Sequence, residues 1–263
     1  EIHVFMGEEN YGLFKYFKKT EQAHKISKGN KYIQALKVAL NYRKLNFDLG
    51  ICPVPMYPKL NNLFMYCLGA EERVGPKKQD TLWNILLTHT NSVNDEEHVA
   101  LQTIKLLDPT VKEIKPSWYP KINLLSVAPS PANQDKVFSL TAPRLMVEVS
   151  NRRLTSQLTI DKIANILNNL FARLDFSVVI FFYGADFDKA QSLRAKLRMP
   201  AEIAITRSLD DFISALTSVD FFLLGDGGAS HLVRALEKPG VALYGFTSVS
   251  RWGILAKNIS YLY

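Results

Sequence analysis

Short apolar runs alternate with helical stripes through the second half of this chain. Residues 176–183 and 219–224 are nearly continuous apolar runs, a pattern typical of strands that are buried on both faces of a sheet. Residues 159–174 instead predict an amphipathic helix, with Thr159 as a suitable N-cap residue. The apolar face of that helix carries Ile160, Ile163, Ile166, Leu167 and Leu170.

This alternation predicts a parallel sheet that is covered on both sides by helices. The expected strands are 144–149, 176–183, 202–205, 219–224 and 241–245, and the expected helices are 159–174, 184–197, 209–216 and 231–237. Ligands of such sheets bind beyond the carboxyl ends of the strands. We therefore expect functional residues in the turns at Ser150, Gly184, Arg207, Asp226 and Gly245.

The pattern is weaker in the first half of the chain. Its expected strands are 2–6, 23–26 and 47–52, and its expected helices are 11–17, 32–42, 60–68 and 96–107. Prolines then recur between residues 115 and 140, where they favour irregular backbone. We predict an N-terminal domain at 1–128, a linker at 129–140 and a C-terminal domain at 141–263.

The size and composition of the chain suit a globular protein. Its 263 residues are 47% hydrophobic, which is enough for one large or two medium domains. No apolar run approaches the roughly 18 residues of a membrane-spanning helix. Cys52 and Cys67 lie in separate apolar segments, so we expect two buried thiols in a reducing, cytoplasmic environment. The sequence begins with Glu1 in a strand-like stretch, and we expect that a preceding part of its first domain is missing.

Basic residues are in excess, with 32 Lys and Arg against 25 Asp and Glu and a net charge of +7. Such an excess favours anionic partners, although dispersed lysines are also consistent with a solvated basic surface. No nucleic-acid signature accompanies the charge, so we expect no nucleic-acid partner. The acidic residues are not clustered and no His-x-x-x-His pair occurs, so we expect no metal site.

The turn after the last long apolar run carries the most specific chemistry. Gly225, Gly227 and Gly228 surround Asp226, so the backbone can turn sharply and approach a ligand closely. A short helical stripe follows at 231–237. A helix that starts after a glycine turn presents backbone N–H groups and a positive dipole end, which suits the phosphates of a nucleotide.

A longer stretch around this turn, 209–252, resembles the C-terminal signature of family 9 glycosyltransferases, the ADP-heptose:lipopolysaccharide heptosyltransferases. The family pattern is Asp-Ser/Thr-Gly-x-x-His, then a small-residue helix, a Pro and a strand that ends in Phe/Tyr-Gly-x-Thr. Its counterparts here are residues 226–231, Ala235-Leu236, Pro239, 243–245 and Thr247. Upstream, the resemblance is weaker and rests on 47–51, 68–75 and His98.

The resemblance implies an α/β fold of the GT-B type, in which two Rossmann-like parallel-sheet domains face a central cleft, here with a truncated N-terminal domain. It also implies metal-independent transfer of a heptose from ADP-heptose to the inner core of lipopolysaccharide or lipooligosaccharide, without a cofactor. The acceptor would be an anionic, lipid-linked saccharide, and the enzyme would be cytoplasmic and peripheral at the inner face of the inner membrane. Three alternatives stay open: another nucleotide sugar, a protein acceptor, and a glycan-binding paralogue without catalysis.

Individual residues receive roles from the same resemblance. The Asp226 carboxylate would accept hydrogen bonds from hydroxyls of the donor sugar, while the N–H groups of Gly227 and Gly228 would meet its phosphates. Lys59, in a proline-rich loop, is the candidate for contact with an anionic acceptor. The other candidate donor-binding residues are Ser150, Asn151, Arg152, Arg153, Asp186, Arg207, His231 and Thr247.

The chain departs from the family pattern in three places. The family's proposed general base is an Asp after its first strand, which we expect in the missing segment, so no catalytic residue is assigned. Gly227 stands where the family has Ser or Thr. Residues 156–159 lack the family's Lys, whose positive charge Arg152 or Arg153 would supply.

Simpler structural roles stay open for the same residues. Asp226 would also suit a helix N-cap, and Asp186 would also suit the first turn of a helix, where a negative charge is favourable. The remaining alternatives are packing for His231, loop roles for Ser150, Asn151 and Thr247, and simple solvation for Lys59.

Overall fold

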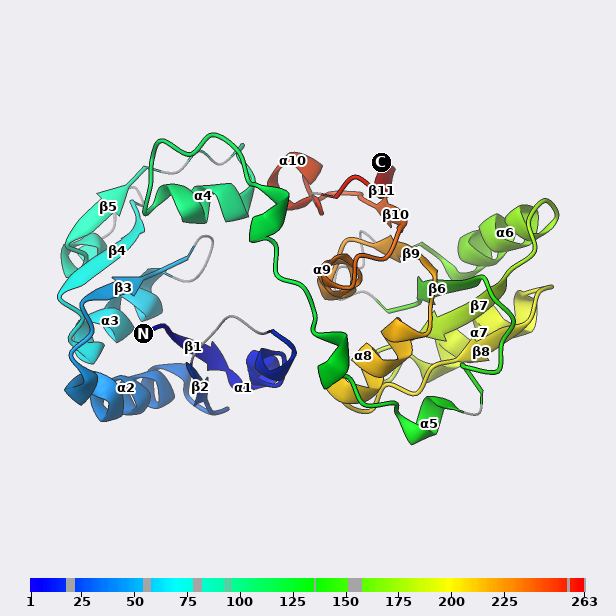
Figure 1. Cartoon of the computed structure of the whole chain (residues 1–263), viewed down its shortest axis with the longest axis horizontal. Coiled ribbons are helices and arrows are strands. Elements are labelled where there is room, and N and C mark those ends of the chain that lie inside the picture. Colours follow the sequence, from blue (N-terminus) through cyan, green and yellow to red (C-terminus); the bar gives the residue numbers. More distant parts are fainter. Residues whose placement is uncertain are drawn as a thin grey trace. The chain divides into compact units, whose positions relative to one another are not determined.

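A computed structural model of the chain describes residues 1–17, 22–53, 58–77, 82–92, 94, 96–134, 136–150, 158–254 and 256–262. The chain forms two compact units, each an α/β assembly with parallel sheets (Figure 1). The first unit comprises Glu1–Phe14, Lys19–Trp118 and Ser250–Trp252. The second unit comprises Lys15–Lys18, Tyr119–Val249 and Gly253–Tyr263.

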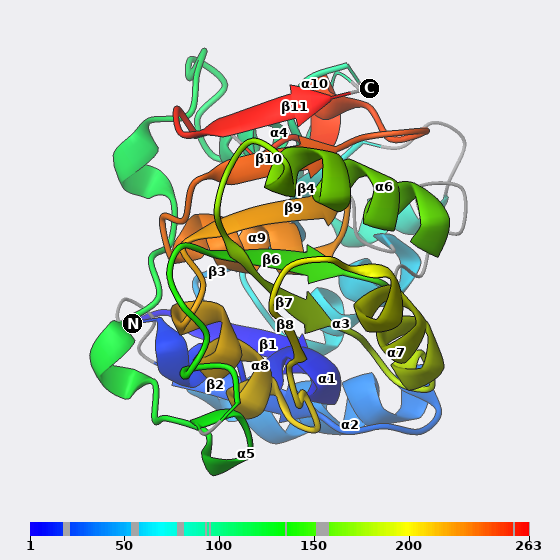
Figure 2. The ribbon, with the colours of Figure 1, turned by 90° about the vertical axis from the view of Figure 1, so that its right-hand side faces the viewer.

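The second unit is built on a six-stranded parallel sheet with the order β11-β10-β9-β6-β7-β8 (Figure 2). The chain enters at β6, builds outward through β7 and β8, and then returns to the other side of β6, so the order reverses between β6 and β9. Such a switch point is where α/β sheets bind ligands. The strands are β6 (Arg144–Glu148), β7 (Ser177–Phe181), β8 (Ala201–Ile203), β9 (Phe221–Gly225), β10 (Gly240–Leu243) and β11 (Ile259–Leu262).

Helices cover both faces of this sheet, as the alternating pattern predicts. One buried cluster joins Val147 and Ile180 to Leu167 of α6 and Leu193 of α7. The other joins the opposite side of the same strands to α8 and α9. These helices are α6 (Ile160–Phe171), α7 (Phe187–Lys196), α8 (Leu209–Thr217) and α9 (Gly228–Ala235). The short helix α10 (Val249–Trp252) falls mostly in the part of the chain that belongs to the first unit.

The five expected strands of this half correspond to β6–β10, and Thr159 is the N-cap of α6, where its hydroxyl accepts the Lys162 N–H at 3.3 Å. Two predictions need correction. The helix expected at 231–237 begins earlier, at Gly228, because the turn is shorter than its glycines suggested. The edge strand β11 was not expected.

The segment 129–140, expected as a linker, packs as part of the second unit. The Asn133 amide is buried and bonds the backbone of Ile205 twice, through its Nδ2 at 2.8 Å and its Oδ1 at 2.7 Å. Val137 lies in the sheet core beside the short helix α5 (Pro131–Gln134). The chain changes unit between Trp118 and Tyr119, upstream of the expected linker.

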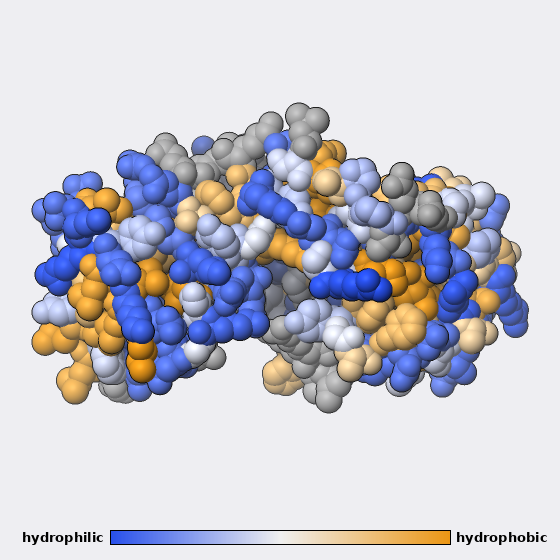
Figure 3. Space-filling model, turned by 90° about the horizontal axis from the view of Figure 1, so that it is seen from below, coloured by the Kyte–Doolittle hydropathy of each residue, from blue (hydrophilic) through white to orange (hydrophobic). Residues whose placement is uncertain are grey.

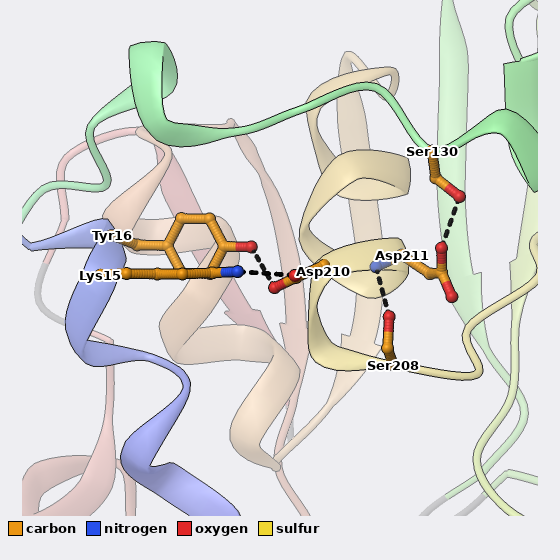
Figure 4. A network of polar contacts seen from close by, with 6 residues as sticks. All are labelled: Lys15, Tyr16, Ser130, Ser208, Asp210 and Asp211. Carbon is orange, nitrogen blue, oxygen red and sulfur yellow. Dashed lines mark hydrogen bonds and ion pairs between the residues drawn. The ribbon is translucent and has the colours of Figure 1, made fainter.

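A short N-terminal segment also belongs to the second unit. Tyr16 is buried, and its hydroxyl donates to Oδ1 of Asp210 in α8 at 2.6 Å (Figure 4). The exposed Lys15 ammonium approaches the other oxygen of Asp210, also at 2.6 Å. On the next residue of α8, Asp211 accepts the Ser130 hydroxyl (Figure 4). The segments around Tyr16 and Ser130, which lie outside the sheet, are thus hydrogen-bonded to two neighbouring carboxylates at the start of α8.

The first unit has two small parallel sheets in place of one large one. β1 (His3–Gly7) pairs with β2 (Gln22–Ile26), and β4 (Glu72–Pro76) lies between β3 (Leu49–Ile51) and β5 (His89–Asn91). Its helices are α1 (Glu8–Tyr11), α2 (Lys31–Tyr42), α3 (Pro58–Leu68) and α4 (Val99–Lys105). Short 3-10 helices occur in the chain at Phe14–Tyr16, Arg43–Leu45, Leu82–Leu86, Pro116–Trp118 and Leu124–Ser126.

Local signals explain α2 and α4. The Asn30 side chain accepts the N–H groups of Tyr32 and Ile33 and so caps α2. His98, the residue that matched the family pattern weakly, is the N-cap of α4 and accepts the Ala100 N–H at 3.2 Å. The two expected buried thiols differ, since Cys52 is buried and Cys67 is only half-buried. No helix among the described residues is long and apolar enough to cross a membrane.

Candidate functional site

The carboxyl ends of the parallel strands in the second unit meet at one edge of the sheet. Ser150 is the second residue after the end of β6, and Asp226 is the first residue after the end of β9. Gly184 lies in the turn that follows β7. Thr247 follows β10 in a loop and is buried. The topology therefore brings together four of the turns that the sequence singled out.

The turn between β9 and α9 is held by hydrogen bonds at both ends. The Asp226 N–H donates to the Leu243 carbonyl of β10 at 3.0 Å, and the residue is only 6% exposed. The buried Ser230 hydroxyl donates to the Gly227 carbonyl at 2.6 Å. These two bonds fix the backbone of the turn that carries Asp226 at the sheet edge.

The first turn of α9 faces open space. Gly227 is the N-cap residue and, as a glycine, has no side chain to cap the helix. A Cβ added to Gly227 or Gly228 would meet no described atom within 4 Å. Asp226 precedes the N-cap position, so the sequence alternative that it is the cap is not what the structure shows. The positive end of the helix dipole lies at this glycine turn, where it would favour an anion.

A second carboxylate lies at the end of β7. The Ser150 hydroxyl accepts the Tyr183 N–H at 2.7 Å, which ties the end of β6 to that of β7. The Lys189 ammonium, 2.9 Å from Asp186, holds the pKa of this carboxyl below its usual value, and the Ser150 hydroxyl adds a hydrogen bond in the same direction. Gly184 turns the chain between them with a φ of 62°, which favours glycine. Ser150 and Asp186 therefore form one polar pair.

The other candidates differ in their positions. His231 is exposed in the first turns of α9, inside the helix, and Arg207 is exposed just before α8. Lys59 is exposed in the first turn of α3, in the first unit. The remaining three candidates, Asn151, Arg152 and Arg153, lie outside the described residues. No group of His, Cys, Asp and Glu side chains suited to a metal occurs among the residues that were placed.

Sequence reasoning missed one ionisable residue near this edge, Glu148. It is the last residue of β6, and burial raises the pKa of its carboxyl to about 7. Because side chains alternate along a strand, Glu148 shares a face of the sheet with Met146, on the side of α8 and α9. A single acidic residue within the apolar run 145–149 is the signal that would have revealed it.

Comparison with solved structures identifies the class of fold. A family 9 glycosyltransferase from Veillonella parvula has a TM-score of 0.82 at 17% identity, covering 100% of this chain and 76% of that one. E. coli ADP-heptose lipopolysaccharide heptosyltransferase II has a TM-score of 0.78 at 18% identity, covering 99% and 80%. E. coli heptosyltransferase WaaC with ADP has a TM-score of 0.69 at 14% identity, covering 98% and 82%. The fold is that of GT-B-like glycosyltransferases.

The sequence itself determines the family. The family model of glycosyltransferase family 9 (heptosyltransferase) matches residues 62–263, so this chain belongs to that family. No curated protein matches the chain. Membership confirms the resemblance carried by residues 226–247, and it makes the protein a transferase that takes a nucleotide-sugar donor and a saccharide acceptor.

Proposed function

We propose that this protein transfers a heptose from ADP-heptose to the inner core of lipopolysaccharide or lipooligosaccharide. The observation that carries the proposal is the turn after β9, where the buried Asp226 carboxylate precedes an α9 N-terminus with open space in front of Gly227 and Gly228. Family membership supports the reaction class. The E. coli enzymes of similar fold, one described with ADP-heptose and one with ADP, support the choice of donor.

Cleavage of the glycosidic bond releases a nucleoside diphosphate, so negative charge must be stabilised as it develops. In this proposal the N–H groups at the start of α9 receive the diphosphate. A helix N-terminus supplies about 0.3–2 kcal/mol per favourable anion contact, which is too little alone for a large rate gain. Basic side chains must therefore contribute, and Arg207, Arg152 and Arg153 are the candidates.

In this proposal the two carboxylates at the sheet edge contact different parts of the donor, the sugar and the ribose. Asp226 accepts hydrogen bonds from hydroxyls of the sugar, close to the diphosphate. Asp186, whose pKa Lys189 holds below its usual value, is ionised at neutral pH, and with the Ser150 hydroxyl it offers acceptors to the ribose. Thr247 and His231 complete the set of proposed donor contacts.

Only one residue is proposed to contact the acceptor. Lys59 is proposed to contact an anionic group of the acceptor, a lipid-linked saccharide at the cytoplasmic face of a bacterial inner membrane. No residue of this sequence is assigned as the general base that removes the proton of the acceptor hydroxyl. Neither a metal nor a cofactor enters the proposed reaction.

Transfer by full-length protein with ADP-heptose and a heptose-deficient inner-core acceptor tests the proposal. Mass spectrometry should show an acceptor lengthened by one heptose. Asp226→Asn should lower kcat/KM about 100-fold, because charged hydrogen bonds to the sugar contribute about 1.5–3 kcal/mol each. The exposed carboxylate of Asp188 in α7 provides the matched control, and Asp188→Asn should leave kcat/KM unchanged.

Four outcomes would contradict the proposal or its site. Transfer only from a different nucleotide sugar would overturn the donor, and modification only of a protein would overturn the acceptor. Nucleotide binding without transfer to any acceptor would identify a glycan-binding paralogue. Unchanged kinetics of Asp226→Asn, in a protein with the wild-type melting curve, would remove Asp226 from the site.

A further inference from the structure

The helix α2 has two faces with different tasks. Its inner face packs Ala35 and Ala39 against Phe64 and Leu68 of α3. The helical repeat places Ile33 and Leu40 on the opposite face, where they are 51% and 59% exposed. A helix in a water-soluble domain normally carries polar residues there. The outer face of α2 therefore carries two exposed apolar side chains.

Positive charge surrounds these apolar side chains. Residues 22–47 contain the basic residues Lys25, Lys28, Lys31, Lys37, Arg43 and Lys44 and no acidic residue. Lys25 and Lys28 form ion pairs with Glu8 and Glu9 of α1. Lys37 shares the outer face of α2 with Ile33 and Leu40, and Lys44 follows the helix in the 3-10 turn Arg43–Leu45. Both lysines are exposed. Figure 3, which views the molecule from below, shows orange and blue side chains mixed over the region of α2.

The helix α6 of the second unit shows that exposed apolar residues alone are ordinary. It has the same length of 12 residues and also leaves Ile166 and Leu170 partly exposed, at 38% each. Its charges are balanced, however, because Asp161 lies beside Lys162 and pairs with Lys196 at 3.0 Å. What distinguishes α2 is the combination of larger apolar exposure with charge of one sign.

We infer that the outer face of α2 docks on an anionic lipid bilayer, with Ile33 and Leu40 entering the headgroup region and Lys37 and Lys44 contacting anionic headgroups. A basic amphipathic helix lies in the plane of such an interface, and lysine stems reach past buried apolar groups to the headgroups. Leu45, in the 3-10 turn that follows α2, is also exposed.

Charge decides between a bilayer and a second copy of the chain. A symmetric dimer through this face would bring the same patch together from both subunits and oppose lysines to lysines. An anionic bilayer instead offers complementary charge and an apolar layer for Ile33 and Leu40. This inference rests on the proposed function and deepens it. A lipid-linked acceptor lies in a membrane, so an enzyme that acts on it needs a surface that binds the membrane.

Vesicle co-sedimentation of the full chain tests this inference without any sugar donor. Wild-type protein should bind vesicles of phosphatidylcholine with phosphatidylglycerol, and should not bind phosphatidylcholine alone. Lys37→Gln/Lys44→Gln should weaken binding on the order of 30-fold, since each cation near an anionic surface contributes a factor of about five. Ile33→Ser/Leu40→Ser should weaken it at least about tenfold. Ile166→Ser/Leu170→Ser on α6 is the matched control and should bind as wild type.

The outcomes separate this inference from the proposed transfer. Because all substituted α2 residues are exposed, their variants should keep the wild-type melting curve and the wild-type rate on a detergent-dispersed acceptor. Asp226→Asn should bind vesicles normally while losing transfer. The inference is overturned if either α2 variant binds vesicles like wild type. It is equally overturned if wild-type binding does not depend on phosphatidylglycerol. It is also overturned if the protein forms a dimer without vesicles and the α2 substitutions act by dissociating that dimer.

Discussion

The two units of this chain bury their sheets to very different depths. Every residue of β7 in the second unit is buried, and core clusters lie on both faces of its sheet. In the first unit all residues of β1 and β5 are at least partly exposed, and the core is divided among small clusters. The same α/β alternation therefore produces one deep sheet and two shallow ones.

This difference parallels the division of the proposed tasks. The candidate donor residues Ser150, Asp186 and Asp226 stand at the edge of the deep sheet, where hydrogen bonds between neighbouring strand ends fix their backbone. A binding constellation needs such rigid support. The first unit instead exposes apolar and basic side chains on α2, which suits a broad contact with a surface.

The largest expected effect compares leucines on two helices of equal length. Leu167 of α6 is fully buried, so Leu167→Ala should cost about 2–5 kcal/mol through lost burial and the cavity left behind. Leu40 of α2 is 59% exposed, and Leu40→Ala should cost less than about 0.5 kcal/mol. Urea unfolding of both variants measures the two costs. Equal costs would break the comparison of deep and shallow units.

The next prediction tests how far solvent is excluded from Glu148 in the sheet of the second unit. Burial raises the pKa of this carboxyl from 4.5 to about 7, so the folded state binds the proton more tightly than the unfolded state. Below pH 4.5 both states are protonated and there is no cost, while the cost grows between pH 4.5 and 7 and then stays constant at about 3 kcal/mol. Glu148→Gln should therefore stabilise the second unit by about 2–3 kcal/mol at pH 8 and by almost nothing at pH 4.

Chemical denaturation at both pH values gives this difference. Glu202→Gln is the control, because Glu202 on β8 is paired with Arg194 at 2.8 Å and should not gain stability at high pH. A Glu148→Gln variant with the same gain at pH 4 and pH 8 would show that the carboxyl is solvated, and that the switch point between β6 and β9 is open to water.

The depth of burial also explains which elements could be predicted. Strands β7 and β9 lie in nearly continuous apolar runs, and β7 is buried throughout, so their pattern is visible without any tertiary information. The three-residue strand β5, His-Thr-Asn, has no such pattern and was not expected. The start of α9 at Gly228 was missed because glycine is a poor helix former, and packing of Ala229 and Val233 on the sheet overrides that preference.

The sequence predicts those features of the candidate site that follow from the order and direction of the strands. Parallel strands put the residues after their carboxyl ends at one edge, so Ser150, Asp186 and Asp226 could be grouped from sequence. The bond from the Tyr183 N–H to Ser150 joins residues 33 positions apart and depends on the register of β6 against β7, which no local pattern specifies. The role of 129–140 was missed for the same reason, since Asn133 finds its partner Ile205 only in the folded sheet.

The smallest expected effect concerns the segment around Tyr16, which belongs to the second unit although the first unit contributes the sequence on both sides of it. Tyr16→Phe removes a buried hydroxyl that donates to Asp210, and should cost about 1.5 kcal/mol, the low end for a hydrogen bond to a charged group, because the Asp210 carboxylate is exposed. Lys15→Met removes an exposed ion pair to the same carboxylate and should cost less than about 0.5 kcal/mol. Urea unfolding at pH 7 ranks the two variants. If Lys15→Met costs more than Tyr16→Phe, surface charge and not burial holds this segment on α8, and the second unit is less self-contained than its deep core indicates.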